Sequence, residues 1–161
     1  MDTLQRLVRY NGWANSRVFE LCAGLDREEL TRPAPGSLGT LAETLQHLVG
    51  VEDGYLTMLR GQDYQAAFGS REAYMQQELA WFLQRPAQLA DDYADLVQHE
   101  NDHTLRREIR MPWFARPVSA LDGYLQVISH SAHHRAQALS VLGARGLPVP
   151  DLDYILMLFD R

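Results

Sequence analysis

The stretch His130-Ser-Ala-His-His-Arg-Ala-Gln137, inside a largely apolar segment from Leu125 to Gly143, decides how the chain is interpreted. His130 and His134 are four residues apart, and on a helix this spacing places both rings on one face, with Cβ atoms about 5–6 Å apart. Two imidazoles so placed can chelate one metal ion. Because the neighbouring residues are apolar and helix-compatible, we expect the pair to face protein and a third ligand to come from another helix.

The composition is that of a globular protein. The chain has 161 residues, of which 46% are hydrophobic and 22% charged, so we expect one domain over residues 1–161. The net charge of −6 argues against a nucleic-acid partner or an anionic membrane, since both require a basic patch.

The single cysteine, Cys22, rules out an internal disulfide and favours a reducing compartment. No apolar run approaches the roughly 20 residues of a membrane span. Arginines interrupt the N-terminal segment where a signal peptide would be apolar. These features predict a cytoplasmic protein.

Apolar residues at helical spacing predict long helices over about residues 3–25, 40–60 and 119–144. Thr40-Leu-Ala-Glu43 matches a capping box at the start of the second helix. Ser70 can cap a further helix, which we expect to break or kink at Pro86 because proline lacks a backbone donor. Helical spacing then continues from residue 87 to about 103. Asp151 can cap a short terminal helix, Leu152–Phe159.

Residues 104–119 show no helical period and are expected to form a long structured connection. Thr104–Met111 within it can form a short extended segment, and aromatic residues including Trp113 and Phe114 would cover one end of the domain. Four main helices and a long connection predict an all-α helix bundle.

Two amides, Asn11 and Asn15, interrupt the apolar stripe of the first helix. A buried amide without a partner costs about 1–3 kcal/mol. Either each amide is bonded to neighbouring backbone, or the two line a polar pocket inside the bundle. The sequence leaves both interpretations open.

His47 lies at the border of the apolar arc of the second helix. A lone histidine in such a place is usually a packed core residue with its hydrogen bonds satisfied. Beside a chelating pair elsewhere, it becomes the leading candidate for the third ligand. Three neutral nitrogens suit Zn, Ni or Fe(II) and leave coordination positions open for water or substrate.

Spacing alone is weak support, because His99 and His103 have the same spacing. They lie in a charged stretch near a helix end, where the helix dipole favours imidazolium ions without any metal. Glu100 and His103 also fit one Glu-x-x-His piece of a di-iron bundle, but a second piece is missing from the sequence. A Gly-x-Ser-x-Gly elbow and a Gly-rich phosphate loop are missing as well.

Three motifs together resemble the DinB family, the DinB/YfiT-like group of bacterial helix-bundle metalloproteins. They are Tyr10-Asn-Gly-Trp-Ala-Asn15, Thr44-Leu-Gln-His-Leu48 and His130-Ser-Ala-His-His-Arg-Ala-Gln137. The resemblance covers nearly the whole chain and implies an up-down-down-up four-helix bundle, commonly a homodimer. It also implies a divalent metal held at the positions of His47, His130 and His134. Ala136 stands where many members have Gly, and His133 is not carried over as a ligand.

The wider superfamily includes thiol-dependent S-transferases, which use low-molecular-weight thiols, and a maleylpyruvate isomerase. The resemblance therefore implies a metal-dependent enzyme that activates a thiol or water, of the thiol S-transferase or hydrolase type, acting on a small molecule. Asn11, Asn15 and Gln137 are candidate pocket residues, whereas Arg135 is expected to form a structural ion pair. Glu52 and Asp53 are both expected to point away from His47.

Two other interpretations stay open. The chain can be a non-catalytic, stress-related protein that binds a metal or a small ligand. Alternatively, His47, His130 and His134 are ordinary core residues.

Overall fold

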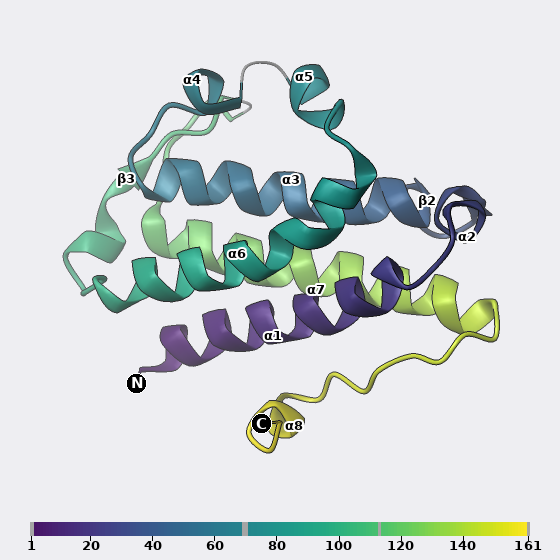
Figure 1. Cartoon of the computed structure of the whole chain (residues 1–161). Helices are drawn as coiled ribbons and strands as arrows, with labels where there is room; N and C mark the ends of the chain where they lie inside the picture. Colours follow the sequence, from purple (N-terminus) through teal and green to yellow (C-terminus); the bar gives the residue numbers. More distant parts are fainter. Residues whose placement is uncertain (1, 69–70, 113, 161) are drawn as a thin grey trace.

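The computed structural model describes residues 2–68, 71–112 and 114–160. Four long helices form a bundle: α1 (Thr3–Ala23), α3 (Leu41–Leu59), α6 (Leu79–Gln98) and α7 (Ala120–Ala144). In Figure 1, α1 and α7 run in one direction, whereas α3 and α6 run in the opposite one. The predicted up-down-down-up four-helix bundle is therefore confirmed.

Short elements connect the long helices. Two pairs of antiparallel strands close the turns before α3 and α7, and small helices lie in the connections and near the C-terminus. These elements are α2 (Arg27–Thr31), β1 (Pro33–Ala34) paired with β2 (Gly39–Thr40), α4 (Tyr64–Phe68), α5 (Arg71–Met75), η1 (Thr104–Arg106), β3 (Glu108–Ile109) paired with β4 (Val118–Ser119), and α8 (Tyr154–Met157). The predicted cap at Ser70 and the aromatic Trp113 lie outside the described residues.

Side-chain caps fix the starts of α3 and α7. The predicted cap at Thr40 is present: its hydroxyl accepts the backbone N–H of Glu43 at 3.1 Å and donates to the Glu43 carboxylate at 2.9 Å. Ser119 caps α7 in the same way, accepting the N–H of Asp122 at 3.1 Å. Each cap satisfies a backbone donor that has no partner within the helix.

The break predicted at Pro86 is wrong, because α6 runs through this residue. Pro86 is one of the buried residues of α6, together with Phe82 and Leu89, whose side chains are almost fully enclosed. A proline inside a helix costs about 3 kcal/mol, and burying each large apolar side chain contributes about 1.5–3 kcal/mol. Packing of this face therefore offsets the lost hydrogen bond, and the helix boundary falls at residues 76–78 instead.

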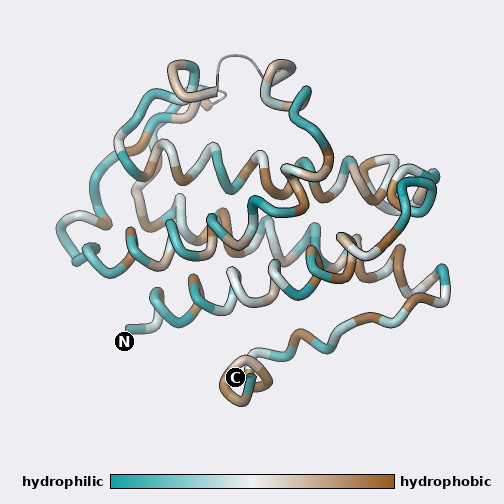
Figure 2. Tube along the Cα trace, viewed as in Figure 1, coloured by the Kyte–Doolittle hydropathy of each residue, from teal (hydrophilic) through white to brown (hydrophobic). Residues whose placement is uncertain are grey.

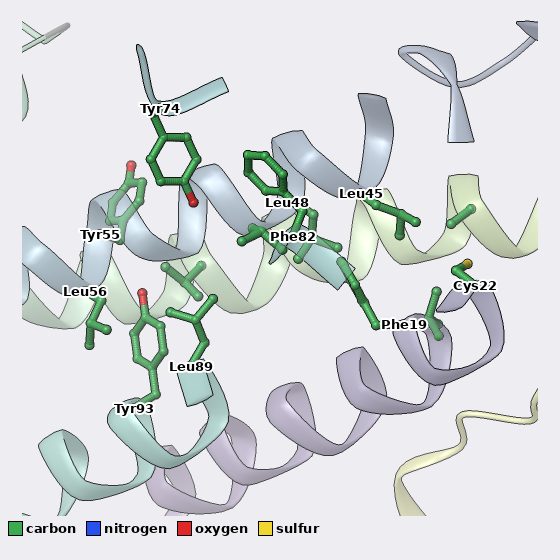
Figure 3. Packing of buried hydrophobic residues seen from close by; sticks show 14 of the residues in the cluster. Phe19, Cys22, Leu45, Leu48, Tyr55, Leu56, Tyr74, Phe82, Leu89 and Tyr93 are labelled. Atoms are coloured by element: carbon green, nitrogen blue, oxygen red, sulfur yellow. The ribbon is translucent and has the colours of Figure 1, made fainter. Parts of the chain in front are cut away.

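The core lies between the four long helices. Figure 2 shows hydrophobic positions recurring along each of them, as expected for helices with one buried face. Cys22 is fully buried, and burial raises the pKa of its thiol to about 12, so it packs as an apolar side chain. Figure 3 shows part of this cluster, with Phe19, Cys22, Leu45, Leu48, Leu56, Phe82 and Leu89.

The C-terminal segment returns along α1. The Tyr10 hydroxyl donates to the Leu152 carbonyl at 2.8 Å, and Trp13 and Arg17 both donate to the Asp160 carboxylate. The predicted short terminal helix is present as α8, which begins two residues later than predicted. Within the described residues, no helix combines the length and apolar character needed to cross a membrane.

Helices α1 and α6 cross closely at Gly12. A Cβ atom there would lie 2.7 Å from the Ala90 Cβ and 3.2 Å from its Cα, and neither atom can turn aside. We therefore expect Gly12→Ala to lower the free energy of unfolding by about 1–3 kcal/mol through overpacking. Urea denaturation followed by circular dichroism measures this change.

Gly24→Ala is the matched control at the end of the same helix. A Cβ at Gly24 would lie 3.5 Å from the nearest atom, the Leu21 carbonyl oxygen, which is ordinary contact. We expect its effect to stay within about 0.5 kcal/mol. Equal effects of the two substitutions would contradict the close crossing.

Candidate metal centre

Three histidine rings converge between α3 and α7. His47 comes from α3, and His130 and His134 come from successive turns of α7. A ring nitrogen of each lies within 4.8 Å of the others, and the Nε2 atoms of His47 and His130 are 3.0 Å apart. The structure thus brings the three predicted ligands together in an arrangement that can hold a metal ion.

Gln137 orients the ring of His134. The Nδ1 atom of His134 lies 2.8 Å from the Gln137 Oε1 oxygen. Because a carboxamide oxygen can only accept, Nδ1 carries the proton and Nε2 keeps its lone pair. An outer hydrogen bond of this kind holds metal-binding histidines in the required tautomer. Gln137, a candidate pocket residue, therefore acts on the cluster through His134.

His130 carries an unsatisfied buried atom. Among the described side chains, its Nδ1 is the one buried nitrogen or oxygen without a hydrogen-bond partner. Burial, assisted by repulsion from His134 and His47, lowers the pKa of His130 to about 3. The ring is consequently neutral, which is the form that binds metals. A neutral, incompletely bonded imidazole beside two others fits a divalent ion.

A pocket of about 300 Å³ opens beside the cluster, with His47 and His130 on its wall. Most of the other lining residues are aromatic or apolar and come from α3, the α4–α5 connection and the 110–119 loop. They are Gln46, Gly50, Val51, Tyr55, Tyr64, Tyr74, Met75, Phe114 and Gln126. The prediction that aromatics of residues 104–119 cover one end of the domain holds only in part, because Phe114 lines this pocket while 58% of its surface is exposed.

Behind the histidines lies a buried carboxylate, Glu52. Its Oε1 oxygen accepts hydrogen bonds from Asn11 and Asn15 at 2.7 Å each and from the Ser131 hydroxyl at 2.6 Å. Burial raises the pKa of Glu52, and the three donors oppose that rise. Glu52 therefore joins α1, α3 and α7, which the sequence did not predict.

Arg135 completes this network. Its Nη1 donates to the Oδ1 atoms of Asn11 and Asn15, both at 2.7 Å. The two amides thus bridge a buried guanidinium and a buried carboxylate, and they lie in this network instead of contacting the histidine cluster. Their partners are thus side chains of α3 and α7, and not neighbouring backbone. Two asparagines one turn apart on an apolar stripe, together with Glu52 and Arg135 in apolar segments, are the sequence signal for such a network.

Asp53 anchors the pocket wall. Its carboxylate accepts the Tyr74 hydroxyl at 2.7 Å and an Arg85 guanidinium N–H at 2.6 Å. Both acidic residues that follow His47 therefore have partners elsewhere. This agrees with the expectation that neither Glu52 nor Asp53 points toward the histidine ring.

The other histidines stay outside the cluster. His99 is the C-cap of α6 and His103 is the N-cap of η1. Neither belongs to the group of potential metal ligands found among the described residues. His133 is exposed, with its ring edge-on to His134 at 4.9 Å between centroids. Position in the bundle, and not spacing, separates His130 and His134 from these residues.

Comparison with known proteins agrees with this architecture. The DinB family model matches residues 1–160 of the chain, and the chain therefore belongs to the DinB family. It is 22% identical over 163 residues to Protein DinB of Bacillus subtilis (strain 168), covering 98% of this chain and 95% of that one.

A solved structure has the same fold. YfiT from Bacillus subtilis, described as a probable metal-dependent hydrolase with an unusual four-helix bundle topology, superposes with a TM-score of 0.69. The match covers 92% of this chain and 91% of YfiT at 13% sequence identity. At this identity the likeness concerns the fold.

The hydrogen-bond network around Glu52 can be tested with two serine substitutions on the same helix, α7. Ser131→Ala removes a hydrogen bond to a buried carboxylate, and we expect it to lower the free energy of unfolding by about 1–3 kcal/mol. Ser129→Ala is the control, because the exposed Ser129 hydroxyl bonds only to the Gln126 carbonyl, at 3.1 Å. Urea denaturation of both variants gives the comparison. A Ser131→Ala protein as stable as Ser129→Ala would contradict the network.

Proposed function

We propose that this chain is a metal-dependent enzyme whose divalent ion is held by His47, His130 and His134. The observation that carries the proposal is the convergence of three ring nitrogens within 4.8 Å at the wall of a pocket. A purely structural role for the histidines explains neither the unsatisfied Nδ1 of His130 nor the adjoining pocket. Three nitrogen ligands from a rigid bundle suit Zn, Ni or Fe(II).

When bound, such an ion acts as a Lewis acid that lowers the pKa of a thiol or a water molecule and provides a nucleophile at neutral pH. The protein would hold the ion and orient the histidine side chains that bind it. Gln137 keeps His134 in the Nδ1–H tautomer, and burial keeps His130 neutral. The pocket beside His47 would receive the substrate.

The reaction is proposed to be thiol S-transfer or hydrolysis. YfiT, which shares the fold, is described as a probable metal-dependent hydrolase, and the DinB-like resemblance includes thiol-dependent transferases. Cys22 cannot supply the thiol, because it is fully buried in the core. A low-molecular-weight thiol would therefore be a second substrate. We also propose a homodimer, as the family resemblance implies, a cytoplasmic location, as the single cysteine favours, and a stress-related role.

Metal binding by variants tests the ligand set. Protein purified without a histidine tag and stripped of metal is titrated with Co²⁺, followed by its visible d–d absorption. We expect one ion per chain for the wild type and no saturable site in His47→Ala or His134→Ala. Gln137→Ala should weaken binding by about 10- to 100-fold, because it only orients a ligand.

His103→Ala, which removes a histidine outside the cluster, is the control and should bind Co²⁺ like the wild type. The assignment fails if His47→Ala and His103→Ala retain the same Co²⁺ stoichiometry and affinity.

Addition of a thiol separates the two reaction types. If the ion activates a thiol, adding a low-molecular-weight bacterial thiol to the Co²⁺ protein should produce a sulfur-to-metal charge-transfer band, with transfer of that thiol to electrophiles. If it activates water, ester or amide hydrolysis should depend on metal, without a thiol-induced band. Stoichiometric metal binding without either activity would favour the non-catalytic binding protein.

A further inference from the structure

We propose that the pocket beside the histidine cluster binds an uncharged aromatic or branched apolar group of the substrate, with its polar atoms paired to the amides of Gln46 and Gln126. This inference names a substrate class and rests on the metal-dependent function proposed above. It does not depend on which nucleophile the ion activates.

Most of the pocket wall is aromatic or apolar. Tyr55, Tyr64, Tyr74 and Phe114 line it, together with the side chains of Val51 and Met75. Aromatic walls favour flat apolar groups, which they bind by stacked or edge-to-face contacts in addition to burial. Pockets that hold small molecules are typically apolar with a few placed polar groups. This pocket has that character.

Tyr74 presents its ring to the pocket because its hydroxyl is bonded elsewhere. The hydroxyl donates to the buried Asp53 carboxylate at 2.7 Å, and Figure 3 shows it directed toward the bundle. The ring can lie against α3 because Gly50 has no side chain, and a Cβ there would be only 3.2 Å from the Tyr74 ring. The aromatic wall is therefore held in place by the fold itself.

Charge is absent from the described lining residues. Behind Tyr74, the buried carboxylate of Asp53 and the half-buried guanidinium of Arg85 are paired with one another at 2.6 Å. Gln46 and Gln126 are neutral and can each donate and accept. A phosphate or carboxylate in the part of the pocket away from the histidines would lose its hydration without gaining a counter-charge from the lining side chains. A neutral group with one or two polar atoms avoids that penalty.

The volume limits the size of the group. About 300 Å³ is at the lower end of the range for small-molecule sites. One six-membered ring with a short substituent fits such a space, together with the part of the molecule that reaches the histidines.

Hydroxamates test the inference, because they share a metal-binding head and differ in their body. The Kd values of acetohydroxamate, benzohydroxamate and 4-carboxybenzohydroxamate are measured with the zinc-loaded full chain and divided by those for aqueous zinc. We expect benzohydroxamate to bind about tenfold more tightly than acetohydroxamate, from the extra apolar area buried. The 4-carboxy derivative should lose most of this advantage.

A matched pair of variants locates the effect. Met75→Glu places a charge on the pocket wall and should reduce the advantage of benzohydroxamate over acetohydroxamate toward one. Leu158→Glu makes the same change at a residue of the C-terminal segment that is 54% exposed and outside the pocket lining. Leu158→Glu should keep the tenfold advantage of benzohydroxamate. Circular dichroism verifies that both variants fold.

The outcomes distinguish this inference from the proposed function. Metal-dependent binding of all three hydroxamates with equal normalised affinity would overturn the aromatic pocket and leave the metal centre intact. Failure of acetohydroxamate to bind the zinc-loaded chain would overturn the metal-dependent function and this inference with it.

Discussion

The buried carboxylate of Glu52 is the constraint on which the rest of this bundle depends. Donors from α1 and α7 converge on one of its oxygens, and Arg135 supplies the compensating positive charge through Asn11 and Asn15. Buried charges are costly unless they are paired and fully hydrogen-bonded. Helix orientations that separate these groups are therefore disfavoured, so the network sets the rotation of α7 against α1 and α3.

The histidine cluster follows from that rotation. Ser131 and Arg135 each come directly after a histidine of α7, and successive residues of a helix are turned by about 100°. Holding Ser131 and Arg135 in the network consequently turns His130 and His134 toward His47 on α3. The buried polar network and the candidate metal centre thus depend on the same rotation of α7. The ion pair of Asp53 and Arg85 has a similar effect at the pocket, because the Asp53 carboxylate accepts the Tyr74 hydroxyl and holds Tyr74 beside the candidate metal centre.

Much of this fold could be predicted because its signals are local. Apolar spacing marked the long helices, Thr40 and Glu43 marked a helix start, and the spacing of His130 and His134 placed two rings on one face. The family motifs added the topology of the bundle. Pro86 shows the limit of local rules: its helix-breaking effect is real, but packing of Phe82 and Leu89 outweighs it.

The sequence by itself determined the helices α1, α3 and α7 and which histidines share a face, because these depend on residues within one or two turns. Only the tertiary structure decided the partners: that Asn11 and Asn15 bridge Glu52 and Arg135, that His47 meets His130, and that tyrosines from a distant connection line the pocket. The physical reason is that a buried polar group takes whichever partner the packed helices bring within hydrogen-bond distance. That partner lies on another helix, tens of residues away in the chain.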